Sequence, residues 1–197
     1  MNTLVIGAIG LGIGVVVGCA AGLWLGARTS PVSGVAFDPA RPTFPTTAGD
    51  NLNGRQVRFP EGIDAPYAVL LVAFYQPQQT QVNTWLDAAK EIVRDHANVE
   101  YYELPTISSN WGVARSWIDN GMRSGIPDFA DRERTVTLYT DVDQFCALAG
   151  IEDKQRIWVG VVDRAGRVYW SVRGPATPEA LKELRSKVRE VAASTGT

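Results

Sequence analysis

The side chains that could carry out nucleophilic or redox chemistry are few and far apart. The 197-residue chain has two cysteines, Cys19 and Cys146, and a single histidine, His96. A dithiol redox centre needs two neighbouring cysteines, and a cysteine zinc site needs still more ligands. Cys19 lies in an apolar N-terminal run and Cys146 in the soluble part, so the two are not expected to pair. The sequence therefore excludes a disulfide framework, a dithiol centre and a multi-cysteine zinc site.

Other catalytic and ligand-binding patterns are also missing. A hydrolytic triad needs a positioned base, but His96 ends a predicted helix and has no serine or aspartate at a motif spacing. Asp141 and Asp143 are expected to begin a helix rather than to bind a metal. No phosphate-binding glycine motif lies between a strand and a helix. With a net charge of −2 and no block of like charge, we predict a non-enzymatic protein without cofactor, metal or nucleic-acid partner.

Cys146 leaves one alternative open. It lies between Phe145 and Ala147 in a short apolar segment, where a buried structural cysteine is the commoner case. A redox protein that uses the single thiol of Cys146 is the alternative function, and a self-associating scaffold is another.

The N-terminus has the features of a membrane anchor. Residues 4–27 carry no charge, and about 20 apolar residues suffice to cross a bilayer as a helix. Because residues 1–3 include no basic side chain, we predict an uncleaved signal anchor over residues 1–28 rather than a cleaved signal peptide. Residues 16–19 loosely match a lipoprotein box with Cys19 as the lipidated residue, but the apolar run continues beyond it.

The orientation of the anchor has two opposing indications. Arg28 alone favours a cytoplasmic domain, yet anchored domains of this type more often face outward. We therefore expect an extracytoplasmic domain on a single-pass anchor.

Glycines recur every four residues within this predicted helix. Small residues at that spacing let two helix backbones approach closely in lipid, although glycine is also frequent in membrane helices generally. We predict a glycine zipper that binds another membrane helix or forms a homo-oligomer. The five residues are Gly10, Gly14, Gly18, Gly22 and Gly26.

A proline-rich segment follows the anchor and precedes the folded domain. Residues 29–50 contain four prolines among Ser, Thr and Gly and show neither helical nor strand periodicity, which is typical of an extended tether. We expect folded structure to begin near the turn Leu52-Asn53-Gly54 and to form one domain over residues 51–197.

Strands and helices are expected to alternate through this domain. Continuous apolar or β-rich runs predict strands at 68–74, 99–104 and 136–139, and a hairpin at 156–162 and 168–172. Helical spacing predicts helices at 78–97, from Ser108 or Ser109 to Met122, from Asp141 to Ala149, and from Thr177 onward. This order predicts an α/β sandwich with a mixed central sheet flanked by helices.

The order resembles the thioredoxin fold in its peroxiredoxin-like form, in which a strand and a helix precede the final hairpin. The resemblance lies in residues 138–141, 145–151 and 156–166. The chain also resembles the mitochondrial-type ATP synthase assembly factors and their bacterial relatives. That similarity rests on the tyrosine-rich strand ending at Leu104-Pro105, on residues 117–126, and on the hairpin from Val161 to Trp170.

The chain departs from redox-active members of this fold where their chemistry takes place. The resemblance implies a cysteine after the first strand, at the start of the first helix, and a cis-proline before the hairpin. Residues 74–82 contain no cysteine, and Lys154-Gln155-Arg156 stands in place of the proline. We therefore predict a redox-inactive domain.

Exposed aromatic residues are the remaining candidates for function. Aromatic side chains and arginine are enriched at protein interfaces, and the polar stretch 120–134 is a candidate recognition loop. Combined with the predicted anchor and the resemblance, this suggests binding to a membrane protein complex as a chaperone-like assembly factor or accessory subunit. The candidate binding residues are Trp111, Trp117, Arg123 and Trp170.

Overall fold

The computed structural model describes residues 43–110 and 115–194. Within these ranges no helix has both the length and the apolar character needed to cross a bilayer. The predicted anchor with its five glycines, most of the predicted tether, and Trp111 lie outside the described residues, so the predictions made for them stay predictions.

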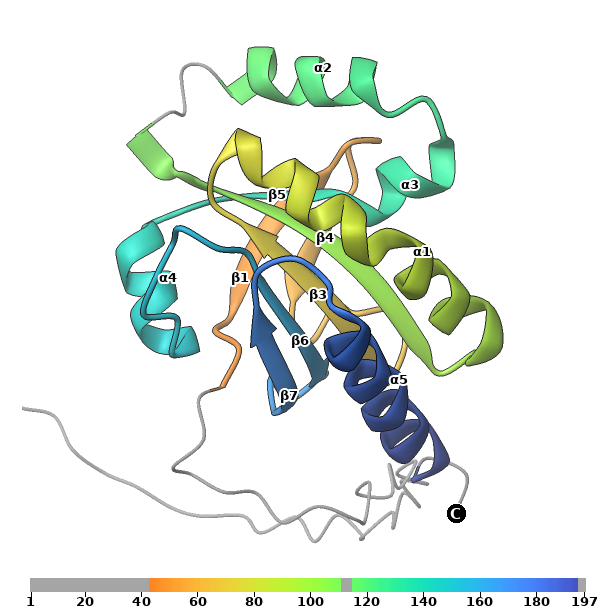
Figure 1. Ribbon diagram of the computed structural model, residues 1–197. Helices are drawn as coiled ribbons and strands as arrows, with labels where there is room; N and C mark the ends of the chain where they lie inside the picture. The colour runs from red at the N-terminus through yellow and green to blue at the C-terminus, as the bar shows by residue number, and fades with distance from the viewer. Residues whose placement is uncertain (1–42, 111–114, 195–197) are drawn as a thin grey trace, which may run out of the picture. The chain divides into compact units, whose positions relative to one another are not determined.

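A seven-stranded mixed sheet forms the centre of the domain, in the order β2-β1-β5-β4-β3-β6-β7 (Figure 1). Three strands run parallel: β3 (Tyr67–Ala73), β4 (Val99–Ser108) and β5 (Val136–Thr140). The hairpin of β6 (Trp158–Asp163) and β7 (Val168–Arg173) pairs antiparallel with β3. β1 (Thr47–Asn51) and β2 (Gln56–Phe59) form a second hairpin next to β5. The predicted strands and the final hairpin are confirmed.

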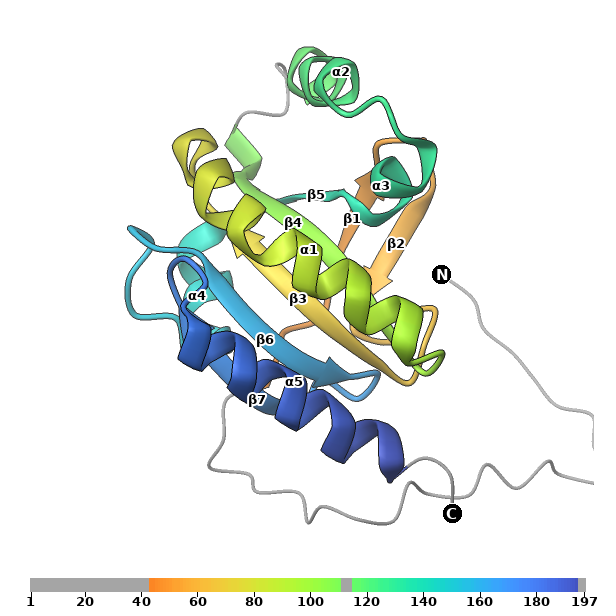
Figure 2. The same cartoon turned by 45° about the vertical axis from the view of Figure 1, so that its right-hand side comes forward.

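Helices cover both faces of this sheet (Figure 2). α1 (Gln79–Asp95) and α5 (Pro178–Ala193) lie on one face, where Trp85, Leu184 and Val188 are fully buried. α4 (Val142–Ala149) lies on the other face, where Phe145 joins a second apolar cluster. Burying apolar side chains on both faces explains why β3 is apolar at nearly every position. The predicted α/β sandwich with a mixed sheet is confirmed.

The helix ends follow the signals in the sequence. Asp141 accepts a hydrogen bond from the Gln144 N–H at 3.0 Å and caps α4. Gly150 ends that helix in a left-handed conformation, with φ of 66°, which costs glycine little. Thr177 caps α5 by accepting from the Ala180 N–H at 3.2 Å, and Pro178 occupies the first turn. The predicted starts of both helices are confirmed.

The ordered domain begins earlier than the predicted boundary at residue 51. β1 starts at Thr47, and Phe44 is 3% exposed in the core. The five residues of β1 include glycine, aspartate and asparagine, which are depleted in strands, so their extended form depends on pairing with β2 and β5 rather than on propensity. Leu52-Asn53-Gly54, where folding was expected to begin, is the turn between β1 and β2.

The region after β4 also differs from prediction. A helix was expected from Ser108 or Ser109, but β4 extends to Ser108, and α2 is described over Arg115–Gly125. The stretch predicted as a polar connection contains α3 (Phe129–Arg134), which Asp128 caps by accepting from the Asp131 N–H. No side chain of α3 is buried, so hydrophobic periodicity could not have indicated this helix.

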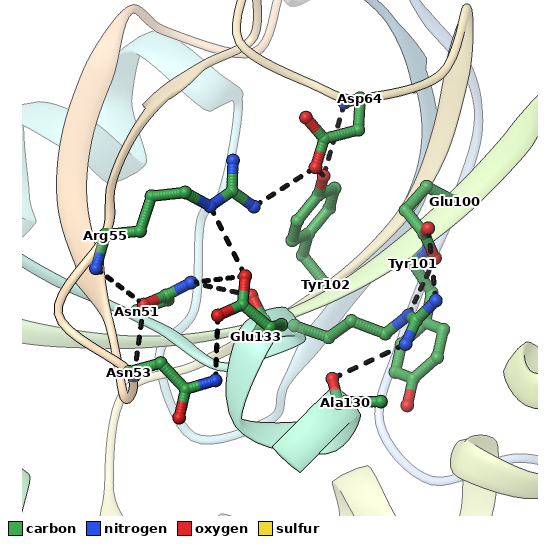
Figure 3. A network of polar contacts seen from close by, with 10 residues as sticks. Asn51, Asn53, Arg55, Asp64, Glu100, Tyr101, Tyr102, Ala130 and Glu133 are labelled. Atoms are coloured by element: carbon green, nitrogen blue, oxygen red, sulfur yellow. Dashed lines mark hydrogen bonds and ion pairs between the residues drawn. The ribbon is translucent and has the colours of Figure 1, made fainter.

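Polar contacts join α3 to the N-terminal hairpin (Figure 3). The Glu133 carboxylate accepts from Asn51 Nδ2 at 3.1 Å, Asn53 Nδ2 at 2.7 Å and Arg55 Nε at 3.3 Å. Arg55 also contacts Asp64 at 3.1 Å. These bonds between segments about 80 residues apart in sequence hold the β1–β2 hairpin beside α3, which contributes no buried apolar side chain there.

Candidate functional site

A cleft of about 580 Å³ lies where the parallel strands end. Its walls come from the segments that follow β3, β4 and β5 and from the loop before β6. In α/β folds this carboxyl edge of the sheet is the usual place for ligand binding, and the size is typical of ligand clefts. The lining residues are Phe74, Tyr75, Thr106, Ile107, Ser108, Ser109, Asn110, Asp141, Val142, Asp143 and Lys154.

One wall of the cleft is the end of β4. The last residue pair between β3 and β4 joins Ala73 to Pro105, but β4 continues to Ser108 and pairs with β5 on its other side. Thr106, Ile107 and Ser108 therefore extend beyond β3 and line the cleft.

The opposite wall is fixed by the side chain of Gln78, which is 4% exposed. Its Oε1 accepts from the Phe74 N–H at 2.8 Å and from the Tyr75 N–H at 3.3 Å. Its Nε2 donates to the Lys154 carbonyl at 2.7 Å. One neutral amide thus cross-links the turn after β3, which includes the short 3-10 helix η1 (Gln76–Gln78), to the loop before β6. A buried polar group needs such partners, and Gln78 has three.

Charged groups from α4 and the loop before β6 form the rim of the cleft. Lys154 forms an ion pair with Asp143, and the hydrogen bond that it donates to that carboxylate raises the pKa of Lys154. Asp141 also lines the cleft, and its carboxylate accepts the capping hydrogen bond from the Gln144 N–H of α4. Since the ion pair neutralises Asp143, the remaining fixed charge on the rim is the negative charge of Asp141.

The cleft has no thiol among its lining residues. Cys146 is 6% exposed and belongs to the apolar cluster on the α4 face, and burial raises the pKa of its thiol. A thiol kept protonated by burial is a poor nucleophile. His96 lies at the C-terminal end of α1, the end away from this turn. Among residues 43–110 and 115–194, no group of three or more His, Cys, Asp or Glu could hold a metal ion.

Among the residues predicted to bind a partner, Trp170 lies on a different element from Trp117 and Arg123. Trp170 lies on β7, where its Nε1 donates to Glu183 at 3.2 Å and its ring is 6.3 Å from that of Trp85. Trp117 and Arg123 belong to α2, and Arg123 is exposed. In both views α2 and β7 lie at opposite ends of the domain. Binding through these residues stays a prediction.

Sequence reasoning did not identify the cleft or the role of Gln78. The signal available was the run Gln76-Pro77-Gln78-Gln79 directly after a buried strand. A periodicity argument has no means to tell which of these three glutamines points inward. Only the fold shows that Gln78 reaches a loop 76 residues later.

Comparison with known proteins shows what fold this is. No protein-family model matches the chain, and no curated protein is significantly similar to it. Among solved structures, BsSco, a member of the Sco family of cytochrome c oxidase assembly proteins, superposes with a TM-score of 0.55 at 14% identity. That match covers 81% of this chain and 98% of BsSco.

Two further solved structures have TM-scores and sequence identities similar to those of BsSco. The thioredoxin domain of a thiol-disulfide oxidoreductase from Bacteroides vulgatus has a TM-score of 0.50 at 15% identity, covering 74% of this chain and 95% of that domain. A conserved protein from Geobacillus kaustophilus has a TM-score of 0.50 at 13% identity, covering 77% of this chain and 80% of that one. These likenesses establish a thioredoxin-like fold for the described domain.

Proposed function

We propose that this chain is a membrane-anchored, redox-inactive thioredoxin-like protein that binds a membrane protein complex as an assembly factor or accessory subunit. The cleft at the carboxyl edge of the sheet is its binding site for the partner. The uncharged run at residues 4–27 and its glycine spacing support the membrane location.

The observation that carries the proposal is the position of Gln78 and its hydrogen bonds. It occupies the turn between the first parallel strand and its helix, where the resemblance places a reactive cysteine. Its amide binds the N–H groups of Phe74 and Tyr75 and the carbonyl of Lys154. An amide can neither form a disulfide nor attack one, and here it serves to fix the two loops. A cleft whose two loops are cross-linked by an amide and whose lining holds no thiol is suited to binding rather than to thiol chemistry.

The assembly role rests on resemblance. The sequence resembles mitochondrial-type ATP synthase assembly factors, and BsSco belongs to a family of cytochrome c oxidase assembly proteins. Because one fold supports many functions, this likeness supports an assembly role without naming the complex that this chain binds.

The proposal is tested by purifying the tagged full-length protein in gentle detergent and quantifying co-purified proteins by mass spectrometry. Two variants accompany it: one lacks residues 1–28, and the other, Ser109→Trp, places an indole at the cleft from an exposed position. We expect one membrane complex with the wild type and its loss with both variants. Stoichiometric recovery identifies a subunit, and sub-stoichiometric recovery identifies an assembly factor. Recovery of no complex by the wild type contradicts the proposal.

Redox inactivity is tested separately through the buried thiol. In a Cys19→Ser background, Cys146 is the only thiol in the chain. We expect a maleimide reagent to label it at least tenfold more slowly in the native protein than in denaturant, because burial both shields the sulfur and raises its pKa. Equal labelling in both conditions favours the alternative of a redox protein using Cys146.

A further inference from the structure

The end of β4 presents a strand edge inside the cleft. Thr106, Ile107 and Ser108 pair with β5 on one side, while β3 stops pairing at Ala73. Three strand residues span roughly 10 Å. In a sheet, successive residues direct their backbone N–H and C=O groups alternately to the two sides, so this segment offers backbone groups toward the cleft.

Gln78 is the reason that β3 does not cover this edge. The chain leaves the sheet at Phe74, and the Gln78 amide holds the N–H groups of Phe74 and Tyr75 in the turn. The position that a longer β3 would occupy is therefore left to the cleft. Lys154, whose carbonyl accepts from Gln78, lines the cleft from the loop before β6.

We propose that the cleft binds an extended peptide segment of the partner protein, which pairs as a short strand with residues 106–108 of β4. This inference rests on the proposed function and specifies what the cleft recognises. Strand addition supplies affinity through main-chain hydrogen bonds, and adjacent pockets select the side chains.

The charges on the rim select the sequence of that segment. Asp143 is paired with Lys154, whereas the exposed Asp141 contributes a negative charge and its carboxylate caps the start of α4. A lysine or arginine in the bound segment would complement Asp141. Tyr75, which is 47% exposed, lines the cleft as well and offers an aromatic surface to a neighbouring apolar side chain. The bound segment is therefore expected to combine β-forming residues with one basic residue.

The experiment uses the purified full-length protein in detergent and a phage-displayed library of random heptapeptides. The library is selected on the wild type after depletion on Ser109→Trp, the variant with the occupied cleft. We expect enriched sequences that place one lysine or arginine among Val, Ile, Thr or aromatic residues. Failure to enrich any sequence over the depleted variant overturns the inference.

Two synthetic versions of an enriched peptide then test strand pairing itself. In one, alternate backbone nitrogens are methylated; in the other, the remaining nitrogens are methylated. Since a strand pairs through every second residue, one pattern should weaken binding roughly tenfold, as expected for two lost backbone hydrogen bonds, and the other should leave it nearly unchanged. Equal affinity of both methylated peptides with the parent overturns strand pairing.

The variant Asp141→Asn tests the charge, because asparagine caps a helix as well as aspartate does. Binding of the enriched peptide should weaken roughly two- to fivefold, as for the loss of an exposed ion pair. If Ser109→Trp abolishes recovery of the membrane complex but no peptide is enriched, the inference fails and the proposed function stands. If the complex is not recovered at all, the proposed function fails.

Discussion

Two buried polar side chains near the start of α1, Gln78 and Glu103, differ in how well their hydrogen-bonding capacity is satisfied. Gln78 is 4% exposed and forms three hydrogen bonds. Glu103 on β4 is 6% exposed, and within residues 43–110 and 115–194 its carboxylate accepts one hydrogen bond, from Gln79 Nε2 at 3.2 Å. The same Nε2 group, which carries two N–H bonds, also donates to Asn83 at 3.0 Å.

The difference shows what burial requires of each group. The neutral amide of Gln78 forms three hydrogen bonds to backbone groups and stabilises the turn in which it lies. Its loss would leave these three backbone groups without their partner. A buried carboxylate with one hydrogen-bond donor is poorly compensated for leaving water. Burial accordingly raises the pKa of Glu103, and the nearby Asp131 adds to the effect. We infer that Gln78 stabilises the fold and that ionised Glu103 destabilises it.

The largest effect is expected from Gln78→Ala. This change leaves the N–H groups of Phe74 and Tyr75 and the carbonyl of Lys154 without their side-chain partner, so we expect a loss of about 1–3 kcal/mol in the free energy of unfolding. Partner recovery should fall as well, because both walls of the cleft depend on this amide. Urea denaturation measures the stability, and Gln76→Ala, at an exposed position of the same turn, is the matched control. Equal stability of the two variants would refute the cross-linking role.

The substitution Glu103→Gln is expected to increase stability, by less than Gln78→Ala decreases it. Because the pKa of Glu103 is raised in the fold from its ordinary 4.5, its contribution to stability is greatest below that pH and is lost as pH rises through the folded pKa. The glutamine avoids this loss and can still accept from Gln79. We expect the Tm to rise by a few degrees at pH 7 and the gain to disappear below pH 4. Thermal melts across this pH range measure it, and a lower Tm at pH 7 would contradict the comparison.

The smallest effect is expected from Gln79→Ala. Gln79 is exposed, so the substitution mainly removes its hydrogen bonds to Glu103 and Asn83, at a cost of about 0.5–1 kcal/mol at pH 7. In the Glu103→Gln background the cost should shrink, since a bond to a charged acceptor is stronger than one to a neutral amide. A double-mutant cycle from urea denaturation isolates this coupling. Strict additivity would indicate that the two side chains do not interact in solution.

The sequence predicted those parts of the fold that depend on apolar periodicity and on helix caps. The strands β3 to β7, the helices α1, α4 and α5, and the caps at Asp141 and Thr177 all carry such signals. β1 carries neither signal, because it is held by strand pairing. α3 carries only the cap at Asp128 and is otherwise held by polar contacts such as those of Glu133. The contacts of Glu133 join residues about 80 positions apart, and no local pattern records them.

For the candidate site, the sequence predicted the missing cysteine but not the cleft. The absence of cysteine after β3 was visible in the sequence, but the cleft depends on where β3 leaves the sheet relative to the end of β4. That register is set by the whole sheet, in which Ala73 pairs with Pro105. The inward side chain of Gln78 follows from the same geometry.

The entry of the chain into the domain has a mechanical consequence. Thr43 forms a bridge with Arg167, and the Phe44 N–H donates to the Gly166 carbonyl at 2.8 Å. The Phe44 ring lies 5.6 Å from that of Phe145 and 6.0 Å from that of Trp158. Tension applied through the preceding residues would therefore act first on the backbone contacts at the β6–β7 turn and on the buried Phe44 ring, before it could separate β1 from the sheet. A pulling experiment through the N-terminus should show an early yield point that Phe44→Ala removes.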